Sequence, residues 1–124
     1  MTIAEMKHYV NLYSQTEEGA WLNDIEWDRK PVVIVDGPGM GSRWLGDIIL
    51  IDPVAANMTD NMQFGTYVHE LRHVWQRKQQ GFLEYALRNL TRKNEPDAED
   101  AGVAGQNWLS DEKCREFKEA RKNK

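Results

Sequence analysis

The chain has 124 residues, of which 40% are hydrophobic, so we expect a single domain over residues 1–124 with its own core but little room for an elaborate substrate cleft. The formal net charge of −4 argues against a nucleic-acid partner, and the cations near the C-terminus are typical of a solvated helix end. Cys114 is the lone cysteine, so no internal disulfide can form, and we expect it to be a small buried hydrophobe. Because no signal-like or long apolar segment is visible, we expect a cytoplasmic protein without a membrane partner.

The first half of the chain predicts a helix followed by two strands. Apolar residues recur at helical spacing over residues 3–15, and His8 lies off that stripe, so it should face solvent. Two short runs rich in β-branched residues, 32–35 and 48–51, predict buried strands joined through the glycine-rich segment 37–42. That segment lacks the Gly-Lys-Ser/Thr ending of a phosphate-binding loop, so we interpret it as a turn. A mixed α+β domain follows.

The next helix carries the most informative motif, His-Glu-Leu-Arg-His at 69–73. Asp60 is expected to cap this helix and Gly81 to end it. Positions i and i+4 share a helix face, so His69 and His73 can direct ring nitrogens at one ion. Glu70 lies about 100° round the helix and can reach a metal-bound water without ligating the metal. Because Zn²⁺ lowers the pKa of bound water to about 7 and polarises a carbonyl, the motif predicts a catalytic zinc site with Glu70 as the base.

The alternative is a chance motif on an ordinary amphipathic helix. The chain contains three histidines, and two of them fall in the motif, which favours the zinc interpretation. A closed structural zinc site is disfavoured, because such sites recruit several cysteines or histidines and one of each remains here, Cys114 and His8.

Two histidines leave a catalytic zinc one protein ligand short. The expected source is a second helix that begins at Pro96, since proline is favoured at the first helical position. We predict Glu99, about one turn inside this helix, as the third ligand. Glu95, which precedes the proline, and Asp100, whose shorter side chain points to another face, remain alternatives. The acidic run could equally compensate the helix dipole and do nothing more.

The sequence His-Glu-Leu-Arg-His-Val-Trp-Gln at 69–76, followed by a helix start rich in Pro and Glu, resembles the gluzincin metallopeptidases. The short chain is similar to their minimal members, the minigluzincins. The metzincins are excluded, because Gln76 and Gln79 stand where that class has glycine and histidine. The resemblance implies a zincin-like domain, with a short sheet packed over the motif helix and a second helix that bears a glutamate ligand. It also implies hydrolysis of peptide bonds.

Carried onto this chain, the resemblance implies His69, His73 and Glu99 as zinc ligands and Glu70 as the catalytic base. In that family an acidic residue often follows the ligand glutamate two or four positions later. Ala101 and Val103 occupy those positions after Glu99. The register of the third ligand is therefore open.

Three further residues or segments are candidates for roles around the zinc. Residues 82–92 predict a connecting helix, on which Tyr85 could donate a hydrogen bond to an oxyanion or be an ordinary core residue. Gln76 lies one turn past His73 and could orient a ligand from behind. If the strand at 44–51 is the sheet edge near the zinc, an extended peptide could add to it.

The leading hypothesis is a zinc metallopeptidase that acts on a peptide or protein substrate, which could bind as an added strand. The alternative is a catalytically silent or latent zincin-like module that binds or regulates a partner. The sequence leaves the substrate and the oligomeric state open.

Overall fold

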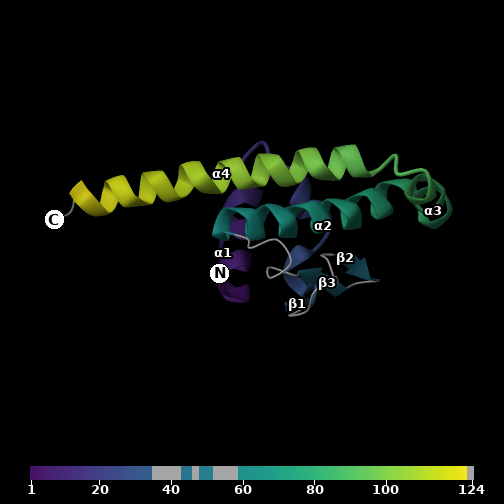
Figure 1. Cartoon of the computed structure of the whole chain (residues 1–124), viewed down its shortest axis with the longest axis horizontal. Coiled ribbons are helices and arrows are strands. Elements are labelled where there is room, and N and C mark those ends of the chain that lie inside the picture. Colours follow the sequence, from purple (N-terminus) through teal and green to yellow (C-terminus); the bar gives the residue numbers. More distant parts are fainter. Residues whose placement is uncertain (35–42, 46–47, 52–58, 123–124) are drawn as a thin grey trace.

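Two long helices lie side by side and form the frame of the molecule (Figure 1). They are α2 (Asp60–Gln80), which carries the histidine motif, and α4 (Glu95–Lys122), and the shorter α3 (Phe82–Leu90) connects them at one end. The computed structural model describes residues 1–34, 43–45, 48–51 and 59–122. This part of the chain is mostly helical with a short sheet, which confirms the expected mixed α+β class. None of its helices combines the length and the apolar character that crossing a bilayer requires.

The ends of the motif helix follow from local chemistry. Thr59 caps α2, with its hydroxyl accepting a hydrogen bond from the Met62 N–H at 3.4 Å. The prediction of Asp60 as the cap was wrong by one residue, because the Asp60 carboxylate instead pairs with Lys113 on α4 at 3.1 Å. Gly81 ends the helix as predicted, at a φ of 79° that a side chain would disfavour.

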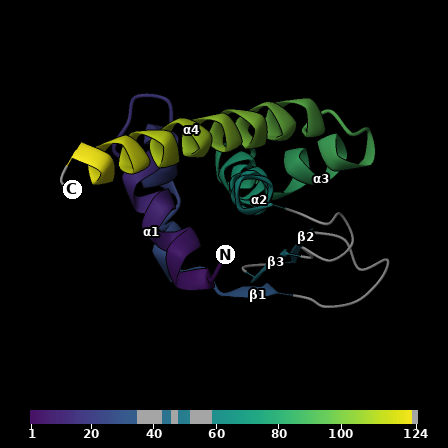
Figure 2. The same cartoon turned by 60° about the vertical axis from the view of Figure 1, so that its left-hand side comes forward.

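The sheet has three short strands in the order β1-β3-β2. Strand β1 (Val32–Ile34) runs parallel to β3 (Ile48–Ile51), and β2 (Arg43–Leu45) runs antiparallel to it. Both predicted strands are therefore present, but only β3 has buried residues as expected: in β1, Val33 and Ile34 are 46% and 39% exposed. Val35 and the glycine segment 37–42 lie outside the described residues. The sheet lies against α2 on the side opposite α4, so the motif helix is the middle layer (Figure 2).

The expected edge strand at 44–51 is corrected by this topology. The segment contributes two antiparallel strands, and β3 lies in the centre of the sheet, with Ile49 opposite Val32 on one side and Trp44 on the other. Ile49 is fully buried, and its N–H donates to the carbonyl of Pro31 at 2.9 Å. Central pairing leaves β3 no free side for a peptide, whereas β2 is an edge of the described sheet.

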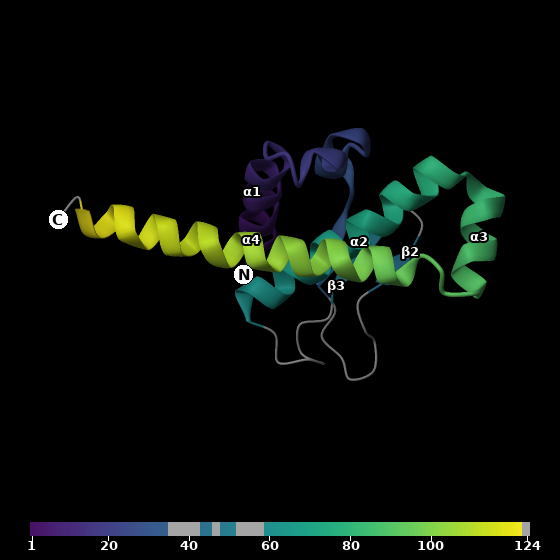
Figure 3. The same cartoon turned by 90° about the horizontal axis from the view of Figure 1, so that it is seen from above.

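Helix α1 (Ile3–Ser14) runs across the long pair and confirms the helix expected at 3–15 (Figure 3). Thr2 and Glu5 form a capping box at its start, and His8 is exposed as predicted. Two 3₁₀ turns, η1 (Ala20–Asp24) and η2 (Trp27–Arg29), lead from α1 toward β1. The core draws residues from all these layers, among them Met6, Val10, Tyr13, Leu22, Ile49, Ile51, Phe64, Tyr67, Val68, Leu71 and Leu109.

Glycines allow α2 and α4 to approach closely beside the motif. A Cβ on Gly65 would stand 2.9 Å from the carbonyl oxygen of Gly102, and a Cβ on Gly102 would stand 2.9 Å from the carbonyl oxygen of Gly65. The Gly102 Cβ would also come within 3.2 Å of the His69 Cβ. Backbone atoms cannot move aside as a flexible side chain can, so this spacing depends on the absence of side chains. The crossing sets how near the start of α4 comes to the histidines.

The last turns of α4 extend beyond the other layers (Figures 1 and 3). Residues 114–121 are exposed, and Phe117 keeps 64% of its surface in solvent. Cys114 lies in this stretch and is exposed, so the expectation that it would be a buried hydrophobe was wrong. Tyr9 on α1 donates a hydrogen bond to Glu116 in this stretch, but no described element buries Cys114, which the helical pattern of one segment cannot reveal.

Candidate metal centre

The two motif histidines and one carboxylate converge where α2 meets the start of α4. His73 Nε2 lies 2.9 Å from Oε1 of Glu95, and His69 Nε2 lies 3.3 Å from Oε2 of the same residue. One potential ligand atom from each of the three side chains falls within 4.8 Å of the others. Because His69 and His73 are one helical turn apart, their rings face the same side of α2 and contact each other, with centroids 5.0 Å apart.

The spacing of these atoms suits a metal ion. Zinc binds imidazole nitrogen and carboxylate oxygen at about 2.0 to 2.2 Å, so ligand atoms on a tetrahedral ion lie roughly 3.3 Å from one another. The two nitrogen–oxygen distances, 2.9 and 3.3 Å, are close to that separation. Two imidazoles and one carboxylate are also a donor set used by catalytic zinc, and three protein ligands leave one position for water. The group could therefore hold a divalent metal ion.

The carboxylate in this group belongs to Glu95 rather than to the predicted Glu99. Helix α4 begins at Glu95, one residue before Pro96, and helical side chains lean toward the N-terminus, so Glu95 reaches back over the histidines. Glu99 and Asp100 are exposed on the next turn and are not part of the described three-residue group. The geometry thus favours an alternative that the sequence left open. Which glutamate binds a metal stays a prediction.

One sequence signal could have pointed to Glu95. The gluzincins, which residues 69–76 resemble, often have an acidic residue two or four positions after the ligand glutamate. After Glu95, those positions are Asp97 and Glu99. The preference of proline for the first helical position concealed this signal, because it predicted a helix that starts at Pro96 and leaves Glu95 outside. The helix in fact begins one residue before Pro96.

A hydrogen-bond network behind the site orients His73. The Gln76 amide group donates to the Asn94 carbonyl at 2.9 Å and to the Asp97 carboxylate at 2.8 Å. Both partners are acceptors, so the amide nitrogen must face them and Gln76 Oε1 must face His73, 2.9 Å from Nδ1. His73 Nδ1 is then the donor, which leaves Nε2 to face Glu95 and the candidate metal position. The predicted supporting role of Gln76 thus has a geometric basis.

Arg72 supports the same network, although its place in the motif gave it no evident role. Its guanidinium donates two hydrogen bonds to Asp97, at 2.8 and 3.1 Å, and lies over the Trp75 ring at 3.8 Å. This pairing and the hydrogen bond from Gln76 hold the pKa of the Asp97 carboxyl below its usual value, against a smaller opposing effect of burial. A charged Asp97 is the stronger acceptor for Gln76.

Burial shifts the pKa values of His69 and Glu70 in opposite directions, and in both residues it favours the neutral form. Burial, and to a lesser degree the neighbouring His73, lower the pKa of His69, which favours the neutral imidazole that binds metals. Glu70 is only 5% exposed, and burial together with the Glu95 charge raises its pKa to about 8. Its carboxyl therefore lies in a poorly solvated place beside the three converging side chains.

Tyr85 on α3 is 6% exposed, and its proposed role as an oxyanion donor stays a prediction.

The candidate centre rests on the described geometry of α2 and α4. No family model, no curated protein and no solved structure matches this chain.

Proposed function

We propose that the protein is a small zinc-dependent metallopeptidase with His69, His73 and Glu95 as the zinc ligands and Glu70 as the catalytic base. The observation that carries the proposal is the convergence of both histidine Nε2 atoms on one carboxylate, with Glu70 next to His69 in the sequence and buried. The resemblance of residues 69–76 to the gluzincins supplies the reaction class. The sheet packed on the motif helix is compatible with a zincin-like domain of the minigluzincin kind.

Bound in this group, zinc would act as a Lewis acid toward the substrate carbonyl and make water acidic near neutral pH. Glu70 accepts the proton that the attacking water loses and transfers it to the nitrogen of the leaving amine. Gln76 holds His73 in the tautomer that presents Nε2, and Asp97 and Arg72 hold Gln76. The low solvation of Glu70 makes its carboxylate a stronger base than one in water.

An extended peptide would bind beside the motif helix by adding to the sheet. The strand that could accept it is β2, which contacts α2 and is an edge of the described sheet. Edge strands offer main-chain hydrogen bonds that suit a peptide of any sequence, so side-chain contacts near the metal would set the specificity.

The decisive variant is Glu70→Gln, which removes the base and keeps the size of the side chain. We expect wild type and variant to hold equal amounts of zinc, and the variant to lose at least about a hundredfold in hydrolysis of a fluorogenic peptide library, since general-base catalysis contributes roughly 10²–10⁴-fold. Undiminished hydrolysis by the variant would refute the mechanism. Zinc binding by a wild type that cleaves nothing in the library would favour the silent module instead.

A further inference from the structure

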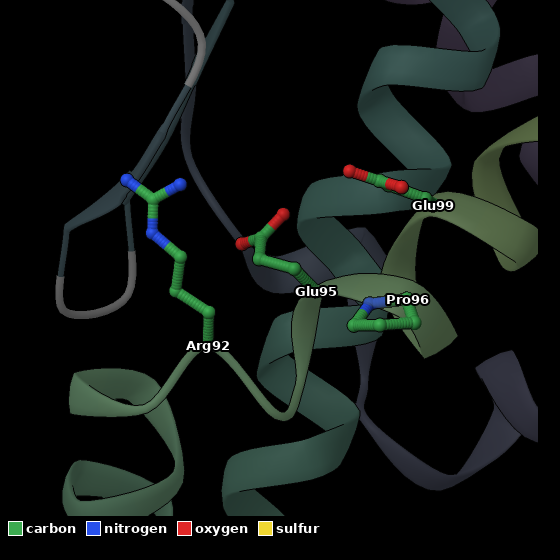
Figure 4. Close-up of a pocket in the computed structure, with 4 residues that line it drawn as sticks. All are labelled: Arg92, Glu95, Pro96 and Glu99. Atoms are coloured by element: carbon green, nitrogen blue, oxygen red, sulfur yellow. The ribbon is translucent and has the colours of Figure 1, made fainter.

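A pocket of about 560 Å³ lies directly against the candidate metal centre, lined by Arg92, Glu95, Pro96 and Glu99 (Figure 4). Arg92 and Glu99 extend on opposite sides of Glu95, so the pocket has a cationic and an anionic end (Figure 4). Because Glu95 is also in the metal-binding group, any molecule that fills the pocket lies beside the metal.

Arg92 occupies an unfavourable backbone conformation in the turn between α3 and α4. Its φ is 56°, in the left-handed region that glycine and asparagine adopt at a lower energetic cost than other residues do. The turn is held by hydrogen bonds from the Lys93 N–H to the Arg88 carbonyl at 3.0 Å and from the Glu95 N–H to the Arg92 carbonyl at 3.3 Å. A turn with no other role would be more stable with glycine here. Non-glycine residues in strained conformations cluster at functional sites.

The charge of Arg92 is not neutralised by the described part of the chain. Arg72 pairs with Asp97 at 2.8 Å and Arg88 pairs with Glu84 at 3.1 Å, but no described carboxylate lies within ion-pair distance of Arg92. Glu95 lines the same pocket, yet its carboxylate is turned to the two histidines. The guanidinium therefore remains available to a bound molecule. Its planar fork of donors matches a carboxylate, which it can hold through two parallel hydrogen bonds.

We propose that Arg92 binds a carboxylate of the peptide substrate and thereby makes the protein select peptides that carry a negative charge near the scissile bond. Glu99 repels the same charge from the opposite end of the pocket, so the bound peptide has one favoured direction. The carboxylate comes either from the C-terminus of a short peptide or from an Asp or Glu side chain. This inference rests on the proposed peptidase function, but its test does not depend on turnover.

The test measures binding to the zinc-loaded Glu70→Gln protein by calorimetry, with two pairs of probes. N-acetyl-trialanine as the free acid and as the carboxamide tests the C-terminal carboxylate. N-acetyl-Ala-Asp-Ala-amide and its Asn counterpart test an acidic side chain. We expect the charged member of at least one pair to bind about tenfold more tightly or better, as a charge-assisted hydrogen-bonded pair supplies. The pair that shows the difference identifies the source of the carboxylate.

The key variant is Arg92→Asn, because asparagine accepts the left-handed backbone and removes only the cation. We expect it to abolish the preference for the charged probe while zinc content and circular dichroism stay unchanged. Arg92→Lys should keep part of the preference, since lysine retains the charge without the fork. Lys93→Gln is the matched control, because Lys93 is an exposed cation in the same turn that does not line the pocket; it should keep the full preference.

Equal binding of charged and neutral probes in both pairs would overturn the inference, as would a preference that persists in Arg92→Asn. If the wild type takes up no zinc, the proposed function fails, and the same probe pairs on the metal-free protein still decide whether Arg92 binds carboxylates. If zinc is bound and the preference is seen but the wild type cleaves nothing in the peptide library, the Arg92 inference is supported and the silent module is favoured over the peptidase.

Discussion

The orientation of a single amide decides which nitrogen of His73 faces the candidate metal position. Gln76 has two acceptors on one side, the Asn94 carbonyl and the Asp97 carboxylate, so its oxygen must turn to His73 Nδ1. The two acceptors fix the Gln76 amide with its nitrogen toward them. If a donor stood in their place, the amide would rotate by about 180° and present its oxygen to that donor. The candidate ligand His73 and the residues that orient it thus form one hydrogen-bonded unit, in which Arg72 and Asp97 are the outer members.

The assignment of the third ligand can be tested with two alanine variants. We expect Glu95→Ala to weaken zinc binding by at least about a hundredfold, because it removes one of three protein ligands. Glu99→Ala should change zinc affinity by less than about tenfold, because Glu99 is exposed and acts on His69 only through its charge. Zinc competition with a chromophoric chelator measures both affinities. The reverse ranking would restore Glu99 as the ligand.

At the scale of the elements, the site depends on two helices that cross closely. Helix α2 positions both histidines by its own periodicity, but Glu95 arrives from α4, and its distance from them depends on the Gly65 and Gly102 crossing. A helix pair of ordinary spacing, about 8 to 10 Å between axes, would leave the carboxylate farther from the rings. Small residues at the crossing are therefore part of the geometry of the candidate metal centre.

Gly102→Ala tests this dependence. Alanine has the better helix propensity by about 1 kcal/mol, but its Cβ would stand 2.9 Å from a backbone oxygen, and overpacking of this kind costs roughly 1 to 3 kcal/mol. We expect a net destabilisation of about 1 kcal/mol in urea unfolding, together with weaker zinc binding. Val103→Ala is the control, because Val103 is 56% exposed on the same helix and should shift stability by less than about 0.5 kcal/mol. If Gly102→Ala left stability and zinc affinity unchanged, the two helices would be able to accept a Cβ at their crossing without cost, which would contradict this dependence.

At the scale of the whole molecule, polar contacts join the helices away from the metal centre. Asp60 at the start of α2 pairs with Lys113 in the C-terminal half of α4 at 3.1 Å. The Lys113 hydrogen bond, and next that of the Met1 ammonium, hold the pKa of the Asp60 carboxyl below its usual value, although partial burial opposes them. Because the pKa is lowered on folding, this stabilisation is present above the unfolded pKa near 3.8 and is lost as the pH falls through the folded value.

We expect Asp60→Asn to lower the free energy of unfolding by less than about 1 kcal/mol at pH 7, because the Asp60 side chain is 46% exposed and solvent screens the pair. The difference from wild type should shrink below pH 3.8 as the wild-type carboxylate protonates. Urea unfolding at several pH values measures it. Asp111→Asn, an exposed position on α4, is the control and should show no such pH-dependent difference. A difference that stays constant from pH 7 to pH 2 would exclude the ion pair as its cause.

Much of the architecture could be predicted because it depends on local periodicity. Helices at 3–15, 60–80 and 82–92, strands within 32–35 and 48–51, and the stop at Gly81 follow from apolar spacing and turn chemistry, and the structure confirms them to within a few residues. The edge position expected for 44–51 and the burial expected for β1 were both wrong, because a β-branched run indicates a strand but neither its neighbours nor what covers it.

The motif helix, the shared face of His69 and His73 and the place of Glu70 about 100° round the helix could all be predicted from the order of residues, because they follow from a repeat of 3.6 residues. The tertiary structure was needed to show which carboxylate meets the histidines, which acceptors orient the Gln76 amide and where Arg92 stands. These depend on where α4 begins and how closely it crosses α2, and contacts between residues some twenty positions apart leave no periodic trace in either helix.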